Sequence, residues 1–303
     1  MRAVSTELAF FGERIERLRA EVGKVLVGQR SVVDGVLACL VADGHVLLEG
    51  VPGLGKTLLV STLSRCLGLT YRRIQFTPDL MPADIVGTHI LGEDESGRRT
   101  LTFQRGPVFT QILLADEVNR ATPKTQSALL EAMAERQVTI GGKTHPLPLP
   151  FFVMATQNPL EMEGTYPLPE AQLDRFFYKV MVPFPTLDEL CEVMDRTTGN
   201  TRVDVQPVIT PDELTEMRRI VRTVAIAPEI QRYAMRVLLG THPDLPHSTS
   251  TAKQYLRYGA SPRGAQTLIL GARVNALFEG REHVSFGDVR KAALPGLRHR
   301  IGR

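Results

Sequence analysis

The feature that most constrains this chain is a glycine-rich segment, Gly50 to Thr57, which reads G-V-P-G-L-G-K-T. It matches the pattern G-x-x-x-x-G-K-[ST], follows an apolar run that ends at Glu49, and leads into a helical pattern. Glycines let backbone N–H groups turn inward around a phosphate, and the helix N-terminus adds partial positive charge. Chance gives this pattern in about 1% of chains of such length, so the segment predicts a phosphate-binding loop between a strand and a helix.

Each position of this segment has an expected part in holding a nucleotide. Lys56 is expected to reach the β- and γ-phosphates, and the Thr57 hydroxyl is expected to hold Mg²⁺. The remaining positions are expected to wrap the backbone around the phosphates, and they are Gly50, Val51, Pro52, Gly53, Leu54 and Gly55.

Two adjacent carboxylates follow the apolar run I-L-L-A at residues 112–115. A buried strand that delivers an acid at its carboxyl end would put Asp116 beside the Mg²⁺, next to the phosphate loop. Glu117 would then orient and polarise the attacking water, because phosphoryl transfer depends on positioning more than on covalent chemistry. Alone, such a pair is more often a solvated strand end. Together with the phosphate loop it predicts nucleotide hydrolysis.

Four more polar side chains are candidates for nucleotide contacts. Asn158 ends a strand pattern and can hydrogen-bond the γ-phosphate or the water, although Asn-Pro also begins turns. Arg263 lies in the first turn of an expected helix, where a cation opposes the helix dipole by about 0.3–1 kcal/mol. An Arg that reaches for a phosphate accounts for that cost, and a solvated Arg is the alternative. Arg175 by itself is an ordinary surface residue, while Arg120 either contacts a neighbour's nucleotide or pairs with local acids.

The first half of the chain alternates short apolar runs with helical patterns, as βαβ units do. These runs are nearly continuous, which fits strands that are covered on both faces of a parallel sheet. The five expected strands are His45–Glu49, Tyr71–Phe76, Ile112–Ala115, Phe151–Thr156 and Phe176–Val182.

From about Pro185 onward, helix starts replace the strand signals. Thr186 and Thr210 are each followed three residues later by Glu, the spacing of a capping box, and Ser261 and Ser285 open two further helices. The sequence therefore predicts an α/β core with a parallel five-stranded sheet over residues 1–184 and a small all-helical domain over residues 185–303.

Composition and charge argue against several classes of protein. The chain has 36 basic and 33 acidic residues, and no run of like charge that would form a nucleic-acid tail or a membrane anchor. We see no signal peptide and no window near 18 apolar residues, so we expect a cytoplasmic protein without a membrane span. Cys39, Cys66 and Cys191 lack metal-ligand spacing and are expected to be small buried hydrophobes.

These motifs, in this order and spacing, resemble the AAA+ superfamily and, more narrowly, its MoxR branch. The resemblance covers nearly the whole chain. It rests on V-G-Q-R (27–30), G-V-P-G-L-G-K-T (50–57), Q-F-T-P-D-L-M-P-A-D-I-V-G (75–87), L-L-A-D-E-V-N-R-A (113–121), A-T-Q-N-P (155–159), Y-P-L-P-E-A-Q-L-D-R-F (166–176), G-A-S-P-R (259–263) and L-P-G-L-R-H-R-I (294–301).

The resemblance implies a role for each candidate residue. Residues 50–57 would be the Walker A motif, Asp116 and Glu117 the Walker B acids, and Asn158 sensor 1. Arg263 would be sensor 2, and Arg175 an arginine finger that acts in trans. The loop that would pack near the adenine contains Val27, Gly28 and Gln29.

The resemblance also implies two inserted hairpins, which in this superfamily tend to face the pore of a ring or the client. Their counterparts here are residues 89–109, with a polar tip between Gly92 and Gly97, and residues 138–148, with a turn at Gly141-Gly142. Relatives usually continue somewhat beyond Arg303, so a helix that completes the lid is expected to be missing.

The function implied by the resemblance is that of a Mg²⁺-dependent ATPase with six subunits in a ring. Such proteins remodel or mature protein complexes in a chaperone-like way, often with von Willebrand factor A-domain partners. ATP and Mg²⁺ are expected between the α/β core and the helical lid, and hydrolysis is expected to change the lid angle.

Two alternatives stay open. A nucleic-acid-associated motor is one, although the sequence has no basic stripe, helix-turn-helix or zinc finger. A nucleotide-gated binding module with slow turnover is the other, although the intact Glu117 argues against a dead site. A small GTPase or kinase is less favoured, because no N-K-x-D motif is present.

Overall fold

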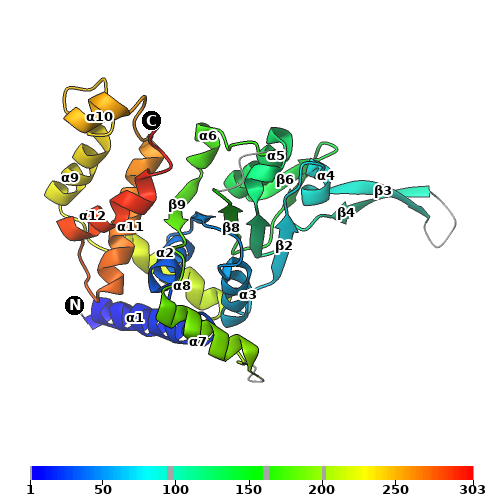
Figure 1. Ribbon diagram of the computed structural model, residues 1–303, viewed down its shortest axis with the longest axis horizontal. Helices are drawn as coiled ribbons and strands as arrows, with labels where there is room; N and C mark the ends of the chain where they lie inside the picture. Colours follow the sequence, from blue (N-terminus) through cyan, green and yellow to red (C-terminus); the bar gives the residue numbers. More distant parts are fainter. Residues whose placement is uncertain (1, 94–98, 160–163, 200–202, 303) are drawn as a thin grey trace.

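The computed structural model describes residues 2–93, 99–159, 164–199 and 203–302 (Figure 1). A sheet with its covering helices occupies the centre, and a group of helices stands beside one edge of that sheet. The helices are α1 (Arg2–Gly23), α2 (Arg30–Val41), α3 (Lys56–Cys66), α4 (Pro82–Val86), α5 (Pro123–Glu135), α6 (Glu170–Leu173), α7 (Leu187–Thr198), α8 (Pro211–Thr223), α9 (Pro228–Leu239), α10 (Ser250–Tyr255), α11 (Pro262–Phe278) and α12 (Phe286–Leu297), with a 3₁₀ turn at Val118–Arg120.

The central sheet is parallel throughout and has the order β2-β5-β8-β1-β9. This confirms the predicted α/β class, and the observed strand ends differ from the predicted ones by at most one residue. The strands are β1 (His45–Glu49), β2 (Tyr71–Gln75), β5 (Ile112–Asp116), β8 (Phe152–Gln157) and β9 (Phe176–Met181).

Alternate residues of β1, β5 and β8 pack into two apolar clusters, because successive side chains of a strand point to opposite faces of the sheet. On one face, Val46 and Leu48 of β1 join α1, α2 and α3. On the other face, Leu47 joins α5. Both faces of the sheet are therefore covered, which is why β1, β5 and β8 read as continuous apolar runs, whereas β2 carries the exposed Arg72 and Arg73.

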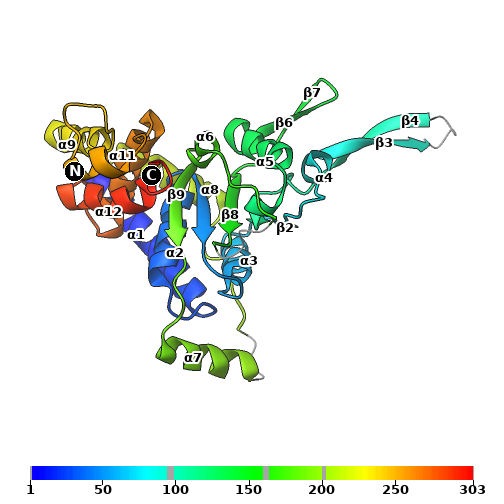
Figure 2. The ribbon, with the colours of Figure 1, turned by 45° about the horizontal axis from the view of Figure 1, so that its top comes forward.

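Two hairpins extend from the side of the sheet that lies away from α9–α12 (Figure 2). They overlap the two segments expected to form hairpins, but the first begins two residues earlier, at Gly87, and the second one residue earlier, at Gln137. Residues 94–98 of the first fall outside the described ranges. The second turns at Gly141 and Gly142, whose φ angles are +58° and +78°. The hairpins touch where Phe103 stacks on His145 at 4.3 Å between ring centroids. Their strands are β3 (Gly87–Glu93), β4 (Arg99–Arg105), β6 (Gln137–Ile140) and β7 (Lys143–Pro146).

Four helices of the second part of the chain, α7, α8, α11 and α12, begin where the sequence expects them, whereas the starts of α9 and α10 were not predicted. Thr186, Thr210 and Ser285 each form a capping box, and the Ser261 hydroxyl accepts from the backbone N–H of Arg263. Helices α8, α11 and α12 share one apolar cluster with α1, α2 and β1. The division between residues 184 and 185 stays a prediction, since that cluster runs across it.

Helices α11 and α12 approach β9 at two glycines that face Tyr178. A Cβ atom at Gly271 would lie only 2.1 Å from the Tyr178 hydroxyl oxygen. A Cβ atom at Gly296 would lie 3.6 Å from the ring of Tyr178. The contact between the helical part and the sheet therefore depends on the missing side chain at position 271.

Two of the three cysteines, Cys39 and Cys66, are buried, as expected. The expectation was wrong for Cys191, which is exposed because none of the residues of its helix, α7, is buried. Of the helices in the described ranges, none has both the length and the apolar content that crossing a membrane requires.

Candidate functional site

The phosphate loop connects β1 to α3, as its pattern predicts. Gly53 and Gly55 adopt φ angles of +84° and +74°, in the left-handed region that residues with a side chain rarely occupy. The Lys56 ammonium donates to the carbonyl oxygens of Gly50 at 2.6 Å and Val51 at 3.1 Å, which curls the loop over the first turn of α3. The loop contains the predicted phosphate-binding residues Gly50, Val51, Pro52, Gly53, Leu54, Gly55, Lys56 and Thr57.

The charge on Lys56 is partly removed from water. Burial lowers the pKa of its ammonium, while the negative charges of Asp116 and Glu117 act in the opposite direction. The two acids therefore lie within electrostatic reach of the loop lysine. A half-buried cation beside free helix amides is suited to an anion such as a phosphate.

The two acids stand at the carboxyl end of β5, where Thr156 of the adjacent strand β8 joins them. The Thr156 hydroxyl donates to Asp116 Oδ1 at 2.6 Å and accepts from the backbone N–H of Glu117 at 2.8 Å. Glu117 itself is in the left-handed conformation, with φ 55° and ψ 50°. A single hydroxyl thus fixes one carboxylate and the backbone of the next.

Side chains from the other neighbouring strand, β2, also bind the acids. Arg73 pairs with Asp116 Oδ2 at 2.7 Å, and the Gln75 amide donates to Glu117 Oε2 at 2.8 Å. Arg120 donates to the same Glu117 oxygen at 2.9 Å. Of the two roles expected for Arg120, the structure therefore favours pairing with a local acid.

Asn158 lies at this same edge of the sheet. It follows Gln157, which is level with Glu49 in the pairing of β8 with β1, and the Gly50 N–H donates to the Gln157 carbonyl at 3.3 Å. Asn158 is 6% exposed. The structure thus brings this predicted sensor residue beside the start of the phosphate loop.

The donor set at this edge fits Mg²⁺. The Asp116 carboxylate and the Thr57 hydroxyl are hard oxygen donors, and Mg²⁺ is usually held by one or two such groups together with phosphates of the substrate. Among the described residues, no cluster of three or more His, Cys, Asp or Glu could hold a metal by itself. A cation here would therefore share its coordination with the nucleotide.

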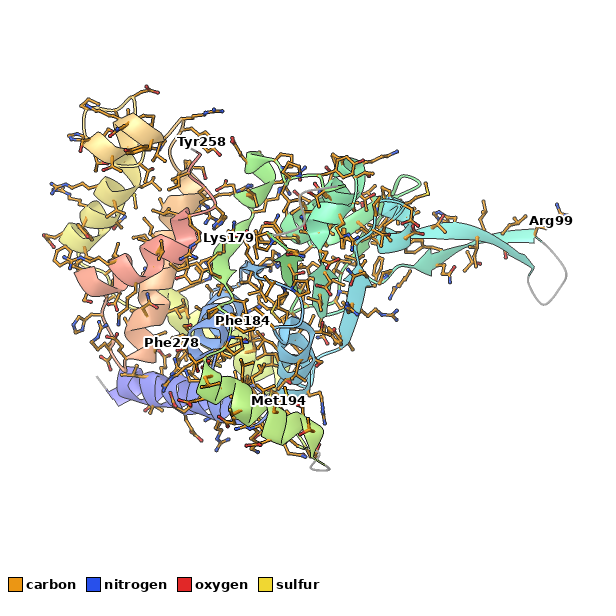
Figure 3. All side chains as sticks on the ribbon, viewed as in Figure 1. Arg99, Lys179, Phe184, Met194, Tyr258 and Phe278 are labelled. Atoms are coloured by element: carbon orange, nitrogen blue, oxygen red, sulfur yellow. The ribbon has the colours of Figure 1, made fainter. Side chains whose placement is uncertain are left out.

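A pocket of about 380 Å³ adjoins the phosphate loop and extends beneath α7. The Gln29 amide spans it by donating to the Leu54 carbonyl at 3.1 Å. A side chain at Gly28 would collide with the Glu189 carboxylate, whose Oε1 would be 2.0 Å from a Cβ atom. Figure 3 labels Phe184 just before α7 and Met194 on it. The pocket is lined mainly by apolar groups, including Val27, Leu54, Leu58, Phe184, Leu190, Val193 and Met194.

Arg175 and Arg263 lie elsewhere. Strands β1 and β9 pair with His45 beside Phe176, so Arg175 stands at the amino end of β1, whereas the phosphate loop leaves its carboxyl end. At about 3.3 Å per residue the two edges are roughly 15 Å apart. Within one chain the structure therefore does not bring the two arginines to the phosphate loop.

The two arginines instead line a second pocket, of about 240 Å³, at the amino edge of the sheet. Arg175 donates to the Leu130 carbonyl at 2.8 Å, while its Nε is buried without a partner. Arg263 is half-exposed, and its Nη1 lies 3.8 Å from Asp174 Oδ2. The charged residues around the pocket are Asp43, Arg136, Asp174, Arg175, Arg222, Arg263 and Arg300.

Sequence reasoning missed Thr156, Arg73 and Gln75. Thr156 was visible only as part of the segment that supplies Asn158. Arg73 and Gln75 alternate along Y-R-R-I-Q and so share one face of a strand. That alternation, at a strand expected to lie in the sheet, was the available signal.

Two family models and several curated relatives match most of the chain. Residues 45–178 match the ATPase family associated with various cellular activities (AAA), and residues 248–303 match the AAA lid domain. The chain is 45% identical over 287 residues to Chaperone MoxR1 of Mycobacterium tuberculosis, covering 95% of this chain and 75% of that protein. It is 31% identical to Protein MoxR of Methylorubrum extorquens, covering 94% and 86%.

Among solved structures, the chain resembles a crystal structure of a protein from Cytophaga hutchinsonii. The two share 41% identity and superpose with a TM-score of 0.91. The match covers 99% of this chain and 91% of the other. The similarity therefore includes the sheet, the hairpins and the helical part alike.

Proposed function

The chain belongs to the MoxR branch of the AAA+ ATPases, and on that premise we propose that it binds ATP with Mg²⁺ at residues 50–57 and hydrolyses it. One observation carries the proposal. Thr156 holds Asp116 and Glu117 together at the carboxyl edge of the sheet, within electrostatic reach of Lys56. A phosphate loop and two fixed acids can position the nucleotide, Mg²⁺ and the attacking water, and phosphoryl transfer depends mainly on such positioning.

Each residue of this edge has a distinct task. Loop amides and Lys56 bind the phosphates, and Asp116 with the Thr57 hydroxyl holds Mg²⁺. When bound, Mg²⁺ supplies positive charge that offsets the charge of the phosphates. Glu117 orients and polarises the attacking water, and Asn158 hydrogen-bonds that water or the γ-phosphate. The pocket beneath α7, near Val27, Gly28 and Gln29, accepts the adenine.

The two remote arginines act on a neighbour's nucleotide in this proposal. Arg175 and Arg263 share one pocket at the amino edge, opposite the phosphate loop of their own chain. A head-to-tail neighbour would bring that pocket to the loop of the next chain, which is the contact that a ring provides. The proposed number of six subunits rests only on the resemblance to the family.

The proposed use of hydrolysis is chaperone-like remodelling or maturation of protein complexes. A relative named Chaperone MoxR1 supports this role. The partners proposed are von Willebrand factor A-domain proteins and a protein client. A nucleic-acid motor has less support, since the net charge of +3 is small for this length. Stimulation of ATP hydrolysis by DNA that disappears with added salt would favour that alternative.

The substitution Glu117→Gln tests the hydrolytic role. The amide keeps the size of the side chain but loses the charge that polarises water, so turnover should fall about 100-fold or more while ATP stays bound. Phosphate release and chromatography of the retained nucleotide measure the two effects. Glu131→Gln, on the exposed face of α5, is the matched control and should hydrolyse ATP as the unmodified protein does. A Glu117→Gln protein with normal turnover would refute the assignment.

A further inference from the structure

Strand β9 is an edge strand, and side chains from the end of the chain bind its exposed backbone. One outer edge of the sheet is β9, so carbonyl groups there have no further strand to pair with. The Arg300 guanidinium donates to the carbonyl of Phe176 at 2.6 Å and to that of Phe177 at 3.1 Å. It also donates to the carbonyl of Asp174 at 3.0 Å. One side chain thus holds the backbone on both sides of Arg175.

The carboxylate of Asp174 completes the binding of this guanidinium. Arg300 Nε donates to Asp174 Oδ1 at 2.8 Å, and Arg300 Nη1 also donates to the Gly296 carbonyl. A guanidinium has five N–H donors, and five acceptors are present here. Arg300 is only 5% exposed. A buried cation with every donor used is fixed in position, because any displacement would leave a donor unpaired.

The same carboxylate also holds the start of α11, where Arg263 lies. The Ser261 hydroxyl is 2.8 Å from the Asp174 carboxylate and donates to it. That hydroxyl also accepts from the Arg263 backbone N–H at 3.1 Å. Asp174 is therefore bonded to Arg300 and to the residue that caps the helix of Arg263, and it directly precedes Arg175 in the chain.

We propose that Arg300, acting through Asp174, is the positioning residue for both arginines that this chain presents to its neighbour. The inference rests on the proposed trans role of Arg175 and Arg263. Arg300 fixes the backbone from Asp174 to Phe177 and so sets the direction of Arg175. Through Asp174 and Ser261 it sets the first turn of α11. A lysine at position 300 keeps the charge but offers three donors in place of five, so it holds fewer of these groups.

The test separates the arginines from the phosphate loop by placing them on different chains. A Lys56→Ala chain keeps the arginines but lacks the loop lysine, and an Arg175→Ala chain keeps the loop. Each should be inactive alone. Mixed together, they should recover ATP hydrolysis wherever a Lys56→Ala chain presents Arg175 to an Arg175→Ala neighbour.

Arg300→Lys is then added to one chain or the other. On the Lys56→Ala chain it should lower the recovered rate about tenfold or more, since a displacement of about 1 Å costs up to about 100-fold. On the Arg175→Ala chain, whose own arginine pocket does not serve the recovered site, the recovered rate should change less than about twofold. Arg290→Lys in α12, where the guanidinium contacts Tyr233 instead of β9, is the matched control and should leave both rates unchanged.

Asp174→Asn provides a milder second variant, because it keeps the backbone carbonyl that Arg300 binds and alters only the carboxylate. It should show the same asymmetry between the two chains. Equal loss on both chains, for both variants, would mean a structural role only and would overturn the inference. Full recovery with either variant on the Lys56→Ala chain would overturn it too. If the unmodified mixture recovers no hydrolysis, the trans role itself fails, and the inference fails with it.

Discussion

Thr156 is the side chain on which the two candidate catalytic acids depend for their orientation. Its hydroxyl bonds both to the Asp116 carboxylate and to the backbone N–H of Glu117. Without that hydroxyl, the Asp116 carboxylate would keep Arg73 as a partner and could rotate toward it. Asp116 and Glu117 would stay in the site, but the orientation of their carboxylates would be less well fixed.

The substitution Thr156→Val should therefore lower kcat about tenfold, with a smaller effect on the affinity for ATP, because valine keeps the shape and removes both hydrogen bonds. Steady-state phosphate release measures the change. Thr139→Val on the exposed β6 strand is a matched control and should have no effect. An unchanged kcat in the Thr156→Val protein would show that Asp116 and Glu117 are held by other groups.

The sequence predicts the phosphate loop and the two acids, but it does not predict the side chains that bind Asp116 and Glu117. Gly50 to Thr57 and Asp116 carry their own local signals, namely a fixed pattern and an acid after an apolar run. Gln75 reaches the site because β2 pairs with β5 in a register that puts it level with Asp116. The order of the strands in the sheet depends on packing between segments that are distant in the sequence, and the motifs at Gly50 to Thr57 and at Asp116 do not specify it.

Helix α7 shows the same limit for a whole element. Its capping box at Thr186 predicts where the helix starts, and the structure has it there. Nothing in that motif says where the helix docks. No residue of α7 is buried, yet Leu190, Val193 and Met194 line the pocket beside the phosphate loop. The helix thus covers the proposed adenine pocket while contributing little to the core.

Substitution of Leu190 by Asp should weaken ATP binding about tenfold, because a charged group would replace an apolar contact worth about 1–3 kcal/mol. Stability should change by less than about 0.5 kcal/mol, as expected for a residue outside the core. Titration with a fluorescent ATP analogue measures the affinity. Leu187→Asp lies on the same helix, is 76% exposed and does not line the pocket, so it should bind normally. Equal affinities for the two variants would exclude α7 from the adenine pocket.

One of the contacts that join the helical part to the sheet lies where α11 and α12 meet β9. The helical part and the sheet share one apolar cluster, so we expect the two to unfold together. At Gly271 the backbone of α11 faces the Tyr178 hydroxyl, with no room for a Cβ atom between them. Tyr178 is buried, so its ring cannot move into solvent to make room for a larger residue at position 271.

Gly271→Ala should destabilise the protein by about 1–3 kcal/mol, because the added methyl group would overlap Tyr178. The sign of the change in the free energy of unfolding is informative, since alanine is otherwise favoured over glycine inside a helix by about 1 kcal/mol. Gly12→Ala in α1, where no described atom lies within 4 Å of the new methyl group, should stabilise the protein instead. Urea unfolding of both variants measures the difference. A Gly271→Ala protein as stable as Gly12→Ala would show that β9 and α11 separate at little cost.

The placement of the phosphate loop and the arginine pocket on opposite edges of one sheet has a consequence for how copies of the chain would associate. Under the proposed trans role, each chain presents an arginine pocket at one end and a phosphate loop at the other. In a linear row of chains, one phosphate loop at one end and one arginine pocket at the other end have no neighbour. If the row closes into a ring, every phosphate loop faces an arginine pocket. Closure therefore completes one more active site than a linear row of the same number of chains contains.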